Sequence, residues 1–316
     1  MILEEFADWV TYSILGLAKG SQLGNAANFF VYDSIKVAVL LAIVVFLVGV
    51  VRTFVTPQKV KQWLGGRREG VGNIFAALLG IPTPFCSCSA VPLFIGFVEA
   101  GVPLGITFSF LISSPLINEI AATLLFAMFG WQIAALYIGT GFVIAVVAGI
   151  VIGRMGLEGE IEEFVNRRKG EAEDEIKGWK DRVKFGLQES RRITLKVLPF
   201  LLIGIAIGAL VHGYVGDNVL ADVAGRNNPL AVPIAVLIGI PLYSNAAGMV
   251  PIVGVLISKG VAVGTALAFM MSVIGLSLPE IVILRRVLKP KLLAIFVAIM
   301  FASFVLTGYL LNLVIA

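Results

Sequence analysis

Residues 80–92 read GIPTPFCSCSAVP, and they interrupt an apolar tract that extends from residue 71 to residue 153. Pro82 and Pro84 direct the chain into an extended path and end any helix that comes before them. Non-helical backbone at bilayer depth is tolerated only where protein or a water-filled cavity surrounds it. The stretch therefore predicts a broken helix that borders an internal site.

The composition predicts a polytopic membrane protein. Of the 316 residues, 59% are hydrophobic and 14% are charged, and the mean hydropathy is +0.98. A soluble domain with so few polar residues could not cover its surface, and a disordered chain would be far more polar. The net charge of +4 is small and the basic residues form no stripe, so we expect no nucleic-acid partner.

Charged and apolar stretches divide the chain into four parts. Residues 1–30 form a segment that we expect to lie in the membrane interface. Residues 31–153 and 193–316 are apolar and form two membrane repeats, with roughly eight to ten membrane segments in total. Residues 154–192 carry many charges of both signs and form a loop outside the bilayer.

Matched glycines, prolines and serines indicate that the second apolar half repeats the first. The matches share an offset of 159 residues, and with a two-residue insertion Glu119 aligns with Glu280. The pairs at the shared offset include Gly80 and Gly239, Pro82 and Pro241, Pro92 and Pro251, and Ser113 and Ser272. Such agreement is hard to obtain from apolar composition alone, so we predict an internal duplication.

Basic residues predict that the two repeats have opposite orientations in the membrane. Short cytoplasmic loops are enriched in Lys and Arg, which places residues 52–68, 154–192 and 285–291 on the cytoplasmic side. Inverted repeats are typical of secondary transporters, whose solute site lies near the membrane midplane between the repeats. The expected fold is therefore all-α and polytopic, with two inverted repeats and broken or re-entrant helices.

Two paths between residues 71 and 130 satisfy this orientation. In one, a broken span over 71–99 precedes a re-entrant hairpin over 103–129; in the other, the tract crosses the membrane three times. Glu99 and Lys259 lie in matching turns and favour the first path, with Glu99 outside and Lys259 inside. The sequence leaves both paths open.

Cys86 and Cys88 are the first candidates for solute binding. In an extended chain, residues two apart share one face, and a helix that starts near Ser87 or Ser89 would favour the thiolate form. Two thiolates suit a soft solute such as trivalent arsenic or antimony with one organic substituent. Zinc fits poorly because a structural zinc site needs four ligands. The alternative is that both cysteines are small apolar residues.

A second polar block, in which Ser113, Ser114, Pro115 and Asn118 lie, follows in the same tract. Ser114 as N-cap and Pro115 in the first turn predict a half-helix that begins inside the membrane. Its amide groups could bind an oxyanion or a metalloid hydroxyl. The alternative is a kink that serves packing only.

The second repeat keeps its break at Pro241 but has no cysteine there. Asn245 takes the place of Cys86, and Tyr243 and Ser244 make the segment polar. We therefore expect the first repeat to supply thiols and the second to supply hydrogen bonds.

Two carboxylates are candidates for proton coupling. Glu119 lies well inside its apolar tract, where a carboxylate is costly and functional by default. Its aligned partner Glu280 is close to Arg285, so an ion pair near the interface is an equal alternative.

The blocks PTPFCSCSAVPLF (82–94) and GVPLGITFSFLISSPLINE (101–119) resemble the ArsP/YraQ-type predicted permease family. The resemblance extends over both repeats. It implies a polytopic inner-membrane permease, and the best understood members export trivalent organoarsenicals. By this resemblance, Cys86 and Cys88 match the motif cysteines of the family. Residues of its second block are matched by Ser113, Ser114, Pro115 and Asn118.

The sequence therefore predicts a secondary efflux permease, not an enzyme, for trivalent organoarsenicals or related thiophilic metalloids. It is expected to be multi-pass in the inner (plasma) membrane, with the 154–192 loop cytoplasmic. Its expected partners are a small solute and membrane lipid; no cofactor is expected, and a homo-oligomer stays open. One alternative is a permease of the same fold for another small solute or anion. A lower alternative is a membrane thiol oxidoreductase that uses Cys86 and Cys88 as a redox pair.

Overall fold

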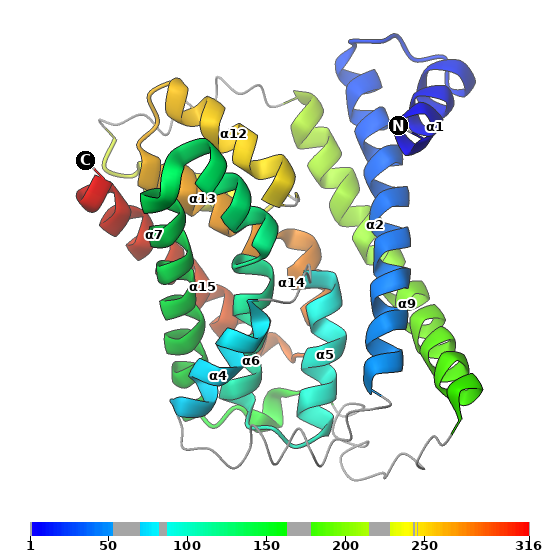
Figure 1. Ribbon diagram of the computed structural model, residues 1–316. Helices are drawn as coiled ribbons and strands as arrows, with labels where there is room; N and C mark the ends of the chain where they lie inside the picture. Colours follow the sequence, from blue (N-terminus) through cyan, green and yellow to red (C-terminus); the bar gives the residue numbers. More distant parts are fainter. Residues whose placement is uncertain are drawn as a thin grey trace.

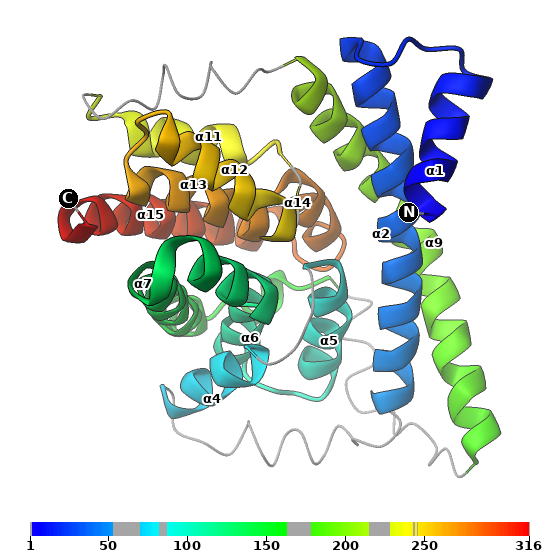
Figure 2. The same cartoon turned by 45° about the horizontal axis from the view of Figure 1, so that its top comes forward.

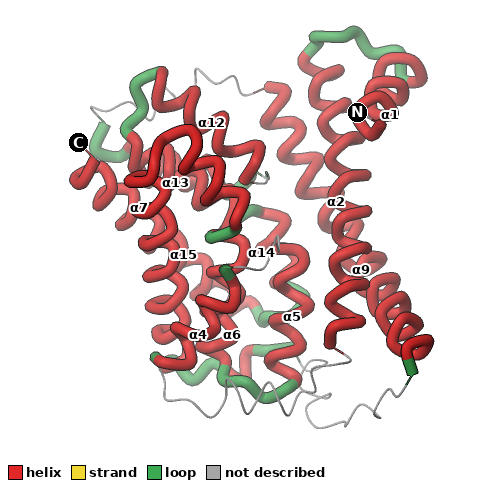
Figure 3. The backbone as a smooth tube through the Cα atoms, in the orientation of Figure 1, coloured by secondary structure: helices red, strands yellow, loops and turns green. Residues whose placement is uncertain are grey.

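The computed structural model describes residues 2–52, 70–81, 87–162, 178–214, 228–242, 244 and 246–315. Helices dominate these residues, and their one β-type pairing is an isolated bridge between Ile161 and Leu288 (Figure 3). Within the described part of the chain, three apolar stretches reach the length of about 20 residues that a membrane span requires: Glu119–Arg154, Val263–Leu284 and Pro290–Ile315. The chain is thus an all-α polytopic membrane protein, as the sequence predicts.

The described helices are arranged as Figure 1 shows. In order they are α1 (Ile2–Asp8), the π-helix η1 (Trp9–Ile14), α2 (Gln22–Arg52), α4 (Val71–Gly80), α5 (Ser87–Glu99), α6 (Leu104–Leu116), α7 (Glu119–Arg154), the 3₁₀ turn η3 (Glu158–Glu160), α9 (Trp179–Tyr214), α11 (Ala231–Gly239), α12 (Ala246–Ser258), α13 (Val263–Gly275), α14 (Leu278–Leu284) and α15 (Pro290–Ile315).

Helices α2 and α9 form a pair at one side of the molecule (Figures 1 and 2). Their backbones approach closely: Ser190 Oγ donates a hydrogen bond of 2.6 Å to Ala42 O, and a Cβ on Gly186 would lie 3.0 Å from Phe46 O. The N-terminal α1 packs against α2 and leaves Phe6 and Trp9 exposed. The interfacial position of this segment stays a prediction.

Helix α7 consists of two helical parts that meet at Gly130. This glycine has φ 85° and ψ 174°, a combination that residues with a Cβ avoid. Residues 119–129 form a short first part and residues 131–154 a long second part, and the helix bends back between them (Figure 1). In the second half, α14 and α15 correspond to these two parts and are separated by a turn.

The helices of the second half repeat those of the first in length, order and packing. The bounds of α5 and α6 return 159 residues later as those of α12 and α13. Helix α6 packs against α4, α5 and α7, and α13 packs in the same way against α11, α12 and α15. Nearly every side chain of α6 and α13 is buried, so these two helices form the centre of the bundle.

The structure corrects the path that the sequence favours between residues 71 and 130. The turn between α5 and α6 lies at the same end of the bundle as residues 153–158, because a Cβ on Gly105 would lie 2.8 Å from Gly153 Cα. Glu99 is therefore not on the opposite side from the charged loop. Helices α4 and α5 have 10 and 13 residues, too short to span a bilayer. We infer that they form the re-entrant pair, and that α6 with the first part of α7 makes the crossing.

Candidate functional site

The segment that precedes the first break packs directly on the second polar block. A Cβ on Gly80, the last residue of α4, would collide with Ser113 Oγ and would lie 3.0 Å from Ser114 N. Both serines belong to α6 and are fully buried. Thus the end of α4, just before the first motif block, contacts the second block about 30 residues further along the chain.

Part of the predicted site lies outside the described residues: Pro82, Pro84, Cys86, Tyr243 and Asn245. Helix α5 begins at Ser87, one of the two starts that the sequence analysis considers, so Cys88 and Ser89 lie in its first turn. The side chains of Ser87, Cys88 and Ser89 also lie outside the description, and their role in binding stays a prediction.

The structure corrects the start of the half-helix in the second block. Ser113, Ser114 and Pro115 lie in the last turn of α6, which ends at Leu116. Ser114 is therefore not an N-cap, and Ser113 Oγ donates to Phe110 O at 3.2 Å. A break does follow Pro115, but only after one more residue. Pro115 has no backbone N–H to donate to the preceding turn, so it weakens the last turn of α6.

Asn118 is the N-cap of the helix that begins after this break. Its backbone is extended, with φ −97° and ψ 158°, and its Oδ1 accepts a hydrogen bond of 2.7 Å from Ala121 N. The same side chain reaches back to α6, where Nδ2 donates to Pro115 O at 3.3 Å. Asn118 therefore joins the end of α6 to the start of α7.

Tyr137 is a residue of this region that the sequence pattern does not indicate. It lies in the long part of α7 and is fully buried, and its Oη donates a hydrogen bond of 3.1 Å to Leu116 O. The pair is separated by 21 residues, so no local motif could reveal it. A tyrosine within an apolar helix is the only available signal, because a buried hydroxyl normally has a partner.

The break of the second half has the same glycine–serine contact as the first, but different hydrogen bonds hold it. A Cβ on Gly239 would collide with Ser272 Oγ, as at Gly80 and Ser113. Here Ile240 O accepts a hydrogen bond of 2.8 Å from Leu278 N, which joins the two breaks of this half directly. Ser277 is the N-cap of α14 and makes no side-chain cap bond. Pro241 follows the end of α11, where the sequence predicts a break, and Ser244 is half-buried nearby in the chain.

The broken ends of α6 and α13 meet in the middle of the bundle. A Cβ on Gly275 would lie 3.5 Å from Cδ1 of Leu116, its counterpart in the first half. Each half also reaches across to the other, since α7 packs on α12 and α14 packs on α5. The breaks that follow α6 and α13 are thus close to one another, between the two halves.

The two candidate carboxylates have different surroundings. Glu119 is exposed at the first residue of α7, whereas Glu280 in α14 is only 2% exposed. The helices themselves begin at Glu119 and Leu278. The sequence alignment of Glu119 with Glu280 through an insertion is therefore wrong, because the structural offset stays at 159 residues. Proton coupling by either residue stays a prediction.

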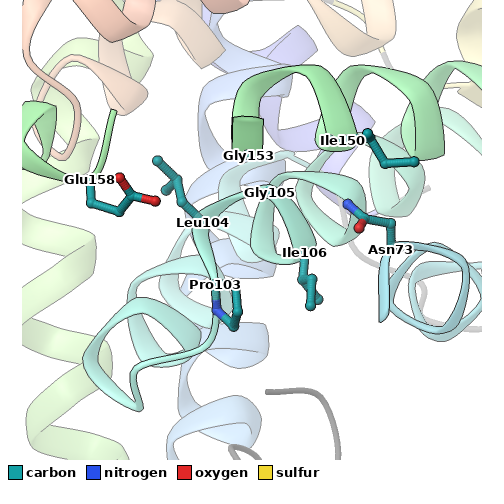
Figure 4. Close-up of a pocket in the computed structure, with 9 residues that line it drawn as sticks. Asn73, Pro103, Leu104, Gly105, Ile106, Ile150, Gly153 and Glu158 are labelled. Atoms are coloured by element: carbon teal, nitrogen blue, oxygen red, sulfur yellow. The ribbon is translucent and has the colours of Figure 1, made fainter. Parts of the chain in front are cut away.

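A separate hollow of about 220 Å³ lies at the other end of α6 (Figure 4). It is about 18 Å from the break that follows α6, because an α-helix rises 1.5 Å per residue and the hollow lies at the first turn of α6. Its lining includes Asn73, Gly153 and Glu158. In the second half, Asn312 takes the place of Gly153, and its Oδ1 accepts a hydrogen bond of 3.2 Å from Thr265 N. The hollow is therefore the space that a missing side chain leaves, rather than part of the central site.

Comparison with known proteins gives a match over nearly the whole chain. The family model ArsP_1, described as a predicted permease, matches residues 22–313. UPF0718 protein MJ0584 of Methanocaldococcus jannaschii is 22% identical over 90% of this chain and 93% of its own length. UPF0718 protein YraQ of Escherichia coli is 26% identical over 77% of this chain and 68% of its own. A Streptococcus mutans protein named as a two-component membrane permease complex subunit is 22% identical over 79% and 83%. No solved structure matches the chain.

Proposed function

This chain belongs to the ArsP_1 family of predicted permeases, and we propose that it is a secondary efflux permease for a thiophilic metalloid. The proposed solute is a trivalent organoarsenical or a related compound. The proposed site lies where the helix breaks of the two halves meet. Family membership makes the chain a membrane permease; the solute, the direction and the site are the proposal.

The observation that carries the proposal is the contact between Gly80 and the Ser113–Ser114 pair. Gly80 ends α4 immediately before the break that contains Cys86, and α5 starts at Ser87 immediately after it. Ile81 and the cysteine motif therefore follow directly after a residue that contacts the buried serines of α6. A site that combines thiolates with hydroxyls would suit a metalloid centre that exchanges thiol and hydroxyl ligands.

We also propose that the two halves are inverted repeats of one ancestral unit. The matched bounds of α5 with α12 and of α6 with α13 support a duplication. The ion pair of Arg285 with Glu162, at 2.9 Å, places the loop before α15 at the same end as the segment after α7. Both are basic or charged loops, which supports a common cytoplasmic side in the inner membrane.

The test is transport in everted membrane vesicles, where efflux appears as uptake. Methylarsenite is the probe, with arsenite and arsenate as comparison solutes, and the wild type is compared with Cys86→Ser and Cys88→Ser. Ala90→Ser is the matched control, because it adds a hydroxyl to a buried position of the same α5 helix.

We expect uptake of methylarsenite by the wild type and the control, and loss of uptake in both cysteine variants. Uptake that is equal in all four proteins would contradict thiol binding. Absence of methylarsenite uptake by the wild type would contradict the proposed solute. An anion held at a helix end would then be the next candidate.

A further inference from the structure

The C-terminal end of α6 is fastened by side chains that come from outside the helix. The last carbonyl groups of any α-helix lack partners within it. In α6, Ser113 O accepts from Ile117 N at 2.8 Å, whereas Pro115 O accepts from Asn118 Nδ2 and Leu116 O accepts from Tyr137 Oη. Two of these three carbonyl groups are thus held by side chains.

Tyr137 connects the break to the long part of α7. Gly141 lies one helical turn further on the same face, and a Cβ there would lie 3.0 Å from Ile117 Cγ1. The residue that ends α6 and the residue that follows it are therefore both fixed against one face of α7. Because Tyr137 is fully buried, its hydroxyl cannot bond to water instead.

The second half shows that the fold itself does not need this hydroxyl. Phe296 of α15 stands where Tyr137 stands, and it is 1% exposed and packs on Phe108 with ring centroids 5.6 Å apart. Ser277 takes the place of Asn118 and makes no side-chain cap bond. The hydrogen bonds that the Asn118 and Tyr137 side chains make are thus specific to the half that carries Cys86 and Cys88.

We propose that Tyr137 is a positioning residue for the solute site. Its hydroxyl holds the end of α6, so that Ser113, Ser114 and Asn118 keep a fixed place beside the end of α4. The proposal rests on the proposed function, since it assumes that these residues border the solute. Removal of the hydroxyl should loosen the break and weaken solute binding without loss of the fold.

The test compares Tyr137→Phe with Tyr309→Phe, purified in lipid nanodiscs. Tyr309 is a matched control because its hydroxyl also donates to a backbone carbonyl, that of Pro229, but on the exposed side of α15. Hydrogen–deuterium exchange of peptides that cover residues 116–122 reports the break directly and requires no solute. Vesicle uptake of methylarsenite gives KM and Vmax separately.

We expect Tyr137→Phe to speed exchange at residues 116–122 about fivefold, the effect of one net hydrogen bond. The KM for methylarsenite should rise by a similar factor at unchanged Vmax, and Tyr309→Phe should change neither. Exchange that matches the control, or an unchanged KM in an active protein, would overturn the proposal. If the wild type does not transport methylarsenite, the proposed function is wrong. The exchange result then decides by itself whether the Tyr137 hydroxyl holds the end of α6.

Discussion

Two glycines of α7 provide a direct test of how the long part of this helix packs. Gly149 faces α6: a Cβ there would lie 2.6 Å from Gly105 O and 2.9 Å from Asn73 Nδ2, and it would collide with Ser109 Oγ. Gly139 lies on the same helix but is exposed, and a Cβ there would meet no other atom within 4 Å. The same substitution, Gly→Ala, should therefore have opposite effects at the two positions.

The size of the effect follows from these contacts. Contacts between carbon and a carbonyl oxygen are normally about 3.3 Å or longer, so α6 and α7 must separate by roughly 0.7 Å to accept Gly149→Ala. Such overpacking typically costs about 1–3 kcal/mol. At Gly139, alanine should stabilise the helix by about 0.5–1 kcal/mol. The two variants should thus differ by roughly 1.5–4 kcal/mol.

The assay is unfolding of the purified protein by SDS in mixed micelles, followed by far-UV circular dichroism. Gly149→Ala should unfold at a lower SDS fraction than the wild type, and Gly139→Ala at an equal or higher one. If Gly149→Ala were as stable as Gly139→Ala, the close packing of α6 on α7 would be refuted. The inferred crossing by α6 and the first part of α7 would then lose its main support.

Two further changes test other contacts by the same assay. Gly153→Asn should cap the start of α6, as Asn312 caps α13, a gain of about 1 kcal/mol. Its Cβ would lie 3.1 Å from Gly105 Cα, so the helices must separate slightly and the net gain should be smaller than that. A stability well below that of the wild type would show that position 153 does not accept the side chain that Asn312 places in the second half. Arg285→Gln removes the half-exposed ion pair with Glu162 and should cost less than about 1 kcal/mol, because exposed pairs are weak. The loss should vanish in concentrated salt; a larger or salt-independent loss would mean that Arg285 acts through another contact.

Several features of the fold follow from the sequence because they depend on local chemistry. The membrane class rests on composition, and the end of α4 just before Pro82 rests on proline geometry. The correspondence of the two halves rests on glycines and serines that the packing requires, such as Gly80 against Ser113 and Gly239 against Ser272. These features can be predicted because proline ends a helix and glycine permits a close contact that a side chain would prevent.

Three other expectations from the sequence are wrong because they depend on how the helices pack and not on local chemistry. Ser114 with Pro115 reads as a helix start, yet both lie in the last turn of α6 and Asn118 is the cap. The charge of Glu99 predicts the wrong side for its turn, because a single charge is weak evidence for orientation. The alignment of Glu119 with Glu280 pairs two residues of the same type, but the starts of α7 and α14 pair Glu119 with Leu278.

The sequence by itself determined the class of protein, the family, the end of the helix before Pro82 and the repetition of the two halves. Each of these is encoded in composition or in spacing along the chain. Only the tertiary structure decided that α4 and α5 lie at one end, that the ends of α6 and α13 meet, and that Tyr137 holds Leu116 from 21 residues away. The physical reason is that a hydrogen bond or a close approach between helices depends on how they cross, and that crossing is set by side-chain packing over the whole bundle.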